Sequence, residues 1–130
     1  MQTSNNSSVD VKNSPTQEEA LLIQEIKNTL ADFIGEDEHE IFYDLIQTYQ
    51  NDACKLVNSL REAIAQGDAK GLRRATHSLK SSSGNLGAHK LAQQAGELEK
   101  QAKANDLSNI TLTQFEIEYN FVCRTLKHFS

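Results

Sequence analysis

The chain contains few of the residues that interrupt helices. Its 130 residues include one proline and six glycines, and there is no tryptophan. Leu, Ala, Gln, Glu and Lys are frequent instead, and these residues have high helix propensity. A chain of this length can form one domain whose core needs neither a metal nor a disulfide. The composition therefore predicts a single all-α domain.

Cysteine is also scarce, and no long apolar run occurs. Cys54 and Cys123 stand alone, without the paired spacing of zinc or redox motifs, so we expect them to be reduced and semi-buried. No stretch approaches the roughly 18 consecutive apolar residues of a membrane span. The residues after Met1 are polar, unlike those of a signal peptide. We therefore expect a cytoplasmic protein that does not insert into membranes.

Acidic residues outnumber basic ones, but not evenly along the chain. The formal net charge is −5. Residues 68–90 contain five Lys or Arg against Asp68 alone, a charge of +4, whereas the remainder carries −9. A globally acidic chain binds nucleic acid poorly, because affinity for the phosphate backbone needs many cations. A single basic segment instead favours a local acidic partner.

The first 17 residues differ in composition from the rest. Eleven of them are Ser, Thr, Asn or Gln, and such a segment buries too little apolar surface to offset the entropy lost on ordering. We expect a disordered tail or linker over residues 1–17 and a helical domain over residues 18–130.

Five amphipathic helices are expected in this domain. Thr16 and Glu19 have the spacing of a capping box, as do Thr111 and Gln114, and Gly35 is a suitable stop for the first helix. Apolar residues recur three and four positions apart; Phe33 and Leu45 are among those expected in the core. The expected helices run from Thr16 to about Ile34, from Asp37 to about Gln66, from Asp68 to about Leu86, from Ala88 to about Ala104, and from Thr111 to the end. Such helices with short loops pack most simply as an antiparallel up-down four-helix bundle, here with an additional N-terminal helix capping one end.

His77 lies in the middle of the basic segment. At about 100° per residue, the apolar stripe of its helix falls directly behind it. The residues within about 60° of His77 are four cations and two small residues: Lys70, Arg73, Arg74, Lys80, Ser81 and Gly84. A helix face with four cations and no carboxylate predicts that an anion comes from elsewhere. The alternative, from the pattern alone, is a solvated histidine among cations that keep the protein soluble.

The residues from His77 to Gly87, HSLKSSSGNLG, resemble the signature of histidine-containing phosphotransfer (HPt) domains, roughly H-x-L-K-G-x-[SA]-x-x-L-G. These eleven residues carry the specific likeness, and a looser one extends from about Leu22 to Leu126. One position departs: members of the family usually have Gly four residues after the histidine, where this chain has Ser81. The departure bears on how closely a partner can approach.

The resemblance implies a role for each residue near His77. His77 would be the phosphoacceptor, Lys80 would stabilise the phosphoryl group, and Glu99 would orient the imidazole through its other ring nitrogen. A phosphorylated response-regulator receiver domain would donate the group, and a second receiver would take it onward. The surface that contacts the partner would comprise Arg73, Arg74, Ser81 and Gly84. The chain would be a monomer, either free-standing or part of a hybrid histidine kinase.

The sequence contains no motif for binding ATP or another nucleotide as a phosphoryl donor. It has no P-loop, no Gly-rich nucleotide loop and no clustered aspartates for Mg²⁺. We therefore expect no cofactor and no intrinsic kinase or phosphatase activity, with Mg²⁺ supplied by the receiver. His39, His89 and His128 lack the spacing of metal ligands, and no nucleophile elbow indicates a hydrolase. The alternative function is a helical interaction module, a degenerate HPt domain that binds an acidic partner through the His77 face without phosphotransfer.

Overall fold

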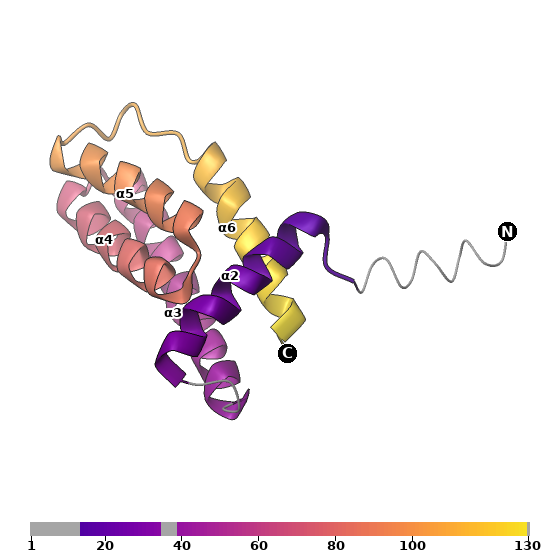
Figure 1. Cartoon of the computed structure of the whole chain (residues 1–130). Helices are drawn as coiled ribbons and strands as arrows, with labels where there is room; N and C mark the ends of the chain where they lie inside the picture. Colours follow the sequence, from indigo (N-terminus) through magenta and orange to yellow (C-terminus); the bar gives the residue numbers. More distant parts are fainter. Residues whose placement is uncertain (1–13, 35–38, 130) are drawn as a thin grey trace, which may run out of the picture.

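A computed structural model describes residues 14–34 and 39–129, and these residues form helices and no strands (Figure 1). The α-helices and one terminal 3₁₀ turn have the following bounds: α2 Gln17–Ile34, α3 His39–Gln66, α4 Ala69–Leu86, α5 His89–Lys103, α6 Thr113–Leu126 and η1 Lys127–Phe129. The prediction of an all-α chain is confirmed. The expectations for residues 1–13 of the tail, and for Gly35 and Asp37 at helix ends, lie outside the described residues.

The capping residues explain where the helices begin. The amide of Glu19 donates to Thr16 Oγ1 and the amide of Thr16 donates to Glu19 Oε1, both at 3.0 Å, so the first capping box is confirmed. The prediction of a capping box formed by Thr111 and Gln114 is wrong. Helix α6 begins at Thr113, and its N-cap residue Leu112 makes no side-chain cap hydrogen bond. Apolar side chains of the preceding loop, Leu107, Ile110 and Leu112, pack against the core beside this helix start.

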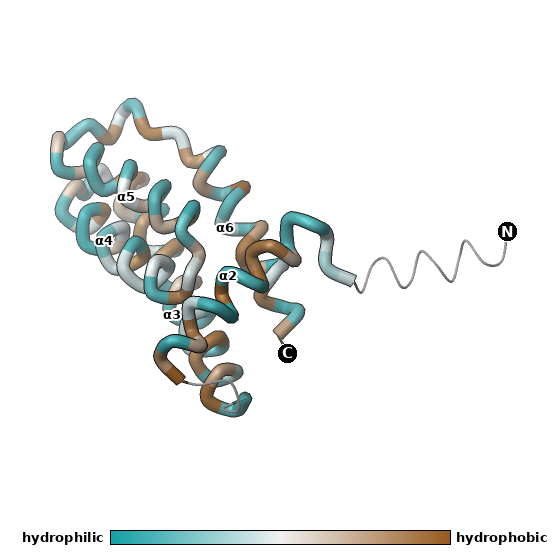
Figure 2. Tube along the Cα trace, in the orientation of Figure 1, coloured by the Kyte–Doolittle hydropathy of each residue, from teal (hydrophilic) through white to brown (hydrophobic). Residues whose placement is uncertain are grey.

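Helices α3 to α6 form the antiparallel bundle, and α4 packs between α3 and α5 (Figure 1). Figure 2 shows apolar positions recurring along each helix and alternating with polar ones. The prediction of burial is wrong for two residues: Phe33 is 73% exposed and Leu45 is 39% exposed. In α3, the side chain of Ile46 enters the core in place of its neighbour Leu45. The fully enclosed core residues include Ile26, Ile46, Val57, Leu60, Leu72, Leu79, Leu91, Val122 and Leu126.

Helix α2 covers the end of the bundle where α4 turns into α5. Gly87 forms this turn with φ of 105°, a conformation that favours glycine. A Cβ atom at Gly87 would also lie only 2.7 Å from Thr29 Oγ1 of α2. The close approach of helix and turn therefore requires glycine on two grounds, and the additional N-terminal helix caps one end of the bundle as predicted.

Two further expectations concern the surface. Cys54 is exposed and Cys123 is half-buried, so the prediction of a semi-buried thiol is wrong for Cys54. Both cysteines are free. Within the described ranges, no helix has the length and apolar character that a membrane crossing requires.

Candidate functional site

Helix α4 presents His77 to solvent on a firmly fixed backbone. The carboxylate of Asp68 caps the helix by accepting from the Gly71 amide at 2.9 Å, and Gly87 ends it. The side chain of His77 is 62% exposed. The residues of α4 that are buried behind it are Leu72, Ala75, Thr76, Leu79, Ser83 and Leu86. The sequence-based prediction of an outward imidazole backed by an apolar stripe is therefore confirmed.

Two buried hydroxyl groups beneath the histidine helix are fully paired. Thr76 Oγ1 donates to the carbonyl of Leu72 at 2.7 Å and lies 3.2 Å from that of Arg73. Ser83 Oγ and the hydroxyl of Tyr49 on α3 are 2.7 Å apart, and burial raises the pKa of Tyr49 to about 12. Both buried hydroxyl groups of α4 therefore have partners, and the bond between Ser83 and Tyr49 links α4 to α3.

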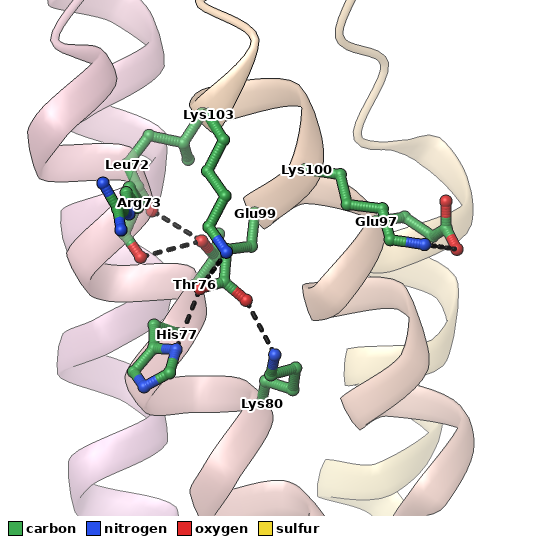
Figure 3. A network of polar contacts seen from close by, with 9 residues as sticks. All are labelled: Leu72, Arg73, Thr76, His77, Lys80, Glu97, Glu99, Lys100 and Lys103. Atoms are coloured by element: carbon green, nitrogen blue, oxygen red, sulfur yellow. Dashed lines mark hydrogen bonds and ion pairs between the residues drawn. The ribbon is translucent and has the colours of Figure 1, made fainter.

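The carboxylate of Glu99 reaches His77 from α5. Glu99 Oε2 lies 2.8 Å from His77 Nδ1, and the Glu99 side chain is only 5% exposed (Figure 3). The hydrogen bond from Lys80 holds the pKa of Glu99 below its usual range, against the opposing effect of burial, and His77 and Lys103 add to the lowering. An ionised carboxylate can only accept hydrogen bonds. Nδ1 therefore carries a proton, and in the uncharged form of the ring the lone pair lies on Nε2.

Lys80 is held by the same carboxylate. Its Nζ donates to Glu99 Oε1 at 2.8 Å. The expected anion for this face therefore comes, in part, from a neighbouring helix of the chain itself. The other three cations, Lys70, Arg73 and Arg74, form no ion pair with any residue of 14–34 or 39–129.

The residues predicted to contact a partner do not share one environment. Ser81 is exposed, but Gly84 is half-buried and faces α5, where an added Cβ would lie 3.9 Å from the Cβ of Ala92. Arg73 and Arg74 are exposed. Arg74 lines a shallow groove between α3 and α4, on the side of α4 away from Glu99. Their contacts with a partner remain predictions.

Two residues on α5 belong to the site but were not identified from the sequence. Lys103 Nζ lies 3.8 Å from Glu99 Oε2. Gly96 lies beside Lys80, because a Cβ atom there would be 3.2 Å from Lys80 Cδ. Their positions four residues after and three residues before Glu99 put them on its face of the helix. That spacing is the sequence signal that could have identified them.

The remaining histidines make structural contacts or lie at the surface. His89 Nε2 is 3.3 Å from Glu25 on α2, and His128 Nε2 is 3.1 Å from Glu19 at the start of α2. His39 is exposed at the start of α3. Over residues 14–34 and 39–129, no group of three or more His, Cys, Asp or Glu side chains could hold a metal ion.

In a comparison with protein-family models, residues 44–123 match the Hpt domain. This range is more than half of the chain and contains His77, Lys80 and Glu99. The chain belongs to the HPt family. A search of curated proteins and a search of solved structures gave no match. As an HPt domain, the chain has a phosphotransfer role in phosphorelays, works with response-regulator receivers and has no catalytic activity of its own.

Proposed function

We propose that His77 accepts a phosphoryl group on Nε2 from the phosphoaspartate of a receiver domain and passes it to a second receiver. The observation that supports this most is the 2.8 Å contact between Glu99 Oε2 and His77 Nδ1. Because this contact keeps the proton on Nδ1, the nitrogen with the free lone pair is the one that faces solvent.

The reaction needs little from this chain beyond a positioned nucleophile. The Nε2 lone pair attacks phosphorus as the bond from phosphorus to the aspartate oxygen breaks, and its electrons leave on the aspartate carboxylate. The proton on Nδ1 stays in the bond to Glu99. Lys80 would turn from Glu99 to a phosphoryl oxygen, where a charge-assisted hydrogen bond stabilises the product. The receiver would supply Mg²⁺.

The unpaired cations suit the approach of an acidic receiver pocket. Arg73 and Arg74 are exposed on α4 on the N-terminal side of His77, and Ser81 is exposed one turn beyond it. A small residue at position 81 lets a partner reach the roughly 3–3.5 Å separation that in-line attack requires. Gly84 and Arg74 would flank this contact on the α5 and α3 sides.

The test is label transfer from a receiver charged with acetyl [³²P]phosphate. We expect acid-labile, alkali-stable label on the wild-type chain and none on His77→Gln, with the same helical circular dichroism for both. Label that persists on His77→Gln would assign the phosphoryl group to another residue and contradict the proposal. Binding of the charged receiver without any label on the wild type would instead support the degenerate interaction module.

The proposal also covers the compartment, the oligomeric state and the N-terminal residues of the domain. We expect a cytoplasmic monomer in which the residues that precede the capping residue Thr16 act as a polar tail or linker, as their composition suggests. The tail would suit a tether to the other domains of a hybrid histidine kinase. Light scattering after gel filtration tests the monomer, and proteolytic cleavage confined to the residues that precede Thr16 would support the tail.

A further inference from the structure

Glu99 is contacted by a second ammonium group besides that of Lys80. Lys103 Nζ lies 3.8 Å from Glu99 Oε2, the oxygen that also meets His77 Nδ1. Lys80 Nζ meets the other oxygen, Oε1, at 2.8 Å. Figure 3 shows the three groups converging on one carboxylate, with His77 and Lys80 reaching from α4 and Lys103 from α5 itself. Among the described residues, no other charged group forms an ion pair with Glu99.

The two lysines cannot keep the same partners after phosphoryl transfer. A phosphoryl group on Nε2 carries close to two negative charges at neutral pH and attracts the nearest mobile cation. If Lys80 turns to it, Glu99 Oε1 loses its 2.8 Å bond. A buried carboxylate without a cation nearby is costly and tends to take up a proton. Protonation of Glu99 would weaken its hydrogen bond with Nδ1–H, because the bond would no longer be charge-assisted.

We infer that Lys103 is a positioning residue that keeps Glu99 ionised and held against Nδ1 while Lys80 serves the phosphoryl group. Lys103 follows Glu99 by one helical turn, so this ion pair stays within α5 and does not depend on the approach of a partner. Its effect on transfer rests on the proposed function. Its effect on Glu99 exists before any transfer and can be measured separately.

The first experiment titrates Glu99 without a phosphoryl donor. Carboxyl ¹³C NMR would follow Glu99 in the wild type, Lys103→Ala, Lys103→Arg and Lys100→Ala. Lys100 is the matched control, because it lies on the same helix, is exposed, and its Nζ is 4.0 Å from Glu97 and not near Glu99. We expect the pKa of Glu99 to rise in Lys103→Ala, to return toward the wild-type value in Lys103→Arg, and to stay unchanged in Lys100→Ala. An unchanged titration in Lys103→Ala would overturn the inference.

The second experiment is a double-mutant cycle on the rate of label uptake. We expect Lys103→Ala to slow uptake roughly three- to tenfold, equivalent to a coupling of about 1 kcal/mol. In a Glu99→Gln background the same substitution should have no further effect, because an amide needs no cation. An equal loss in both backgrounds would show that Lys103 acts directly on the phosphoryl group or the receiver, and would overturn the positioning role. Absence of label on the wild type would refute the proposed function alone, since the titration still decides the inference.

Discussion

Glu99 and Glu118 are both buried carboxylates beside a lysine, yet their pKa values are shifted in opposite directions. The Glu99 side chain is 5% exposed and that of Glu118 is 10% exposed. Lys80 lies 2.8 Å from Glu99, whereas Lys90 lies 3.8 Å from Glu118. The hydrogen bond from Lys80 outweighs burial and lowers the pKa of Glu99, but burial outweighs Lys90 and raises the pKa of Glu118. Burial alone therefore does not decide the direction of a carboxylate's pKa shift; in these two glutamates the distance to the nearest lysine decides it.

The largest difference between the two carboxylates should appear in phosphoryl transfer. Glu99→Ala removes the group that keeps the proton on Nδ1, so we expect label uptake to fall by about tenfold or more, as is typical when the hydrogen-bond partner that orients a histidine is lost. Glu118→Ala should leave uptake within about twofold of the wild type. Quenched-flow measurement with a charged receiver gives both rates. Equal losses in the two variants would remove the distinction drawn between the sites.

Lys80→Ala tests the donor that separates the two carboxylates. We expect uptake to slow roughly fivefold and the phosphohistidine lifetime to shorten, because one charge-assisted hydrogen bond to the phosphoryl group is lost. The pKa of Glu99 should also rise, which moves this carboxylate toward the behaviour of Glu118. Circular dichroism should stay unchanged, since Lys80 is partly exposed. A wild-type lifetime in Lys80→Ala would show that Lys80 holds Glu99 and does nothing for the phosphoryl group.

The two carboxylates should affect stability with opposite dependence on pH. A lowered folded-state pKa at Glu99 contributes stability that is present above the unfolded value of about 4.3 and is lost as the pH falls through the folded value. A raised pKa at Glu118 contributes stability at low pH that is lost as the pH rises through its folded value.

Urea unfolding of Gln variants across the acid range checks these signs. Glu99→Gln should flatten the loss of stability on acidification. Glu118→Gln should stabilise the domain near neutral pH by roughly 1 kcal/mol and have no stabilising effect in acid. A Glu118→Gln variant that is destabilised at neutral pH would mean that the pair with Lys90 outweighs the burial of Glu118.

Gly96→Ala should have the smallest effect on transfer. The added Cβ would lie 3.2 Å from Lys80 Cδ, so the lysine stem must move by a few tenths of an ångström. We expect transfer to slow by less than about twofold, while replacement of glycine inside α5 raises stability by up to about 1 kcal/mol. Thermal unfolding and label uptake measured together show both changes. Faster transfer would mean that Lys80 is better placed when it is pushed away from α5.

Most of the fold could be predicted from the sequence because local signals define the helices. Asp68 and Gly87 mark the ends of α4, and the capping box at Thr16 marks the start of α2. The errors at Phe33 and Leu45 have a different origin. Both residues continue an apolar pattern, but the rotation of each helix against its neighbours decides which side of the pattern is buried, and that rotation is a tertiary property.

The candidate site was predictable to a similar degree. The apolar stripe of α4 indicated that His77 faces outward, and the resemblance to HPt domains indicated Glu99. The link between Lys80 and Glu99 was not predicted, because the pattern of one helix cannot show which side chain of the next helix it meets. The same limit applies to the contact between Gly96 and Lys80, although the position of Gly96 on the Glu99 face of α5 could be read from its spacing.

The most direct test of the proposed phosphotransfer is to identify which ring nitrogen of His77 carries the phosphoryl group. Long-range ¹H–¹⁵N NMR on ¹⁵N-labelled protein charged by a receiver resolves the two ring nitrogens of His77, and coupling to ³¹P marks the one that is bonded. We predict phosphorus on Nε2 with a proton retained on Nδ1, and a change in this proton signal in Glu99→Gln. Phosphorus on Nδ1, or on any residue other than His77, would contradict this prediction.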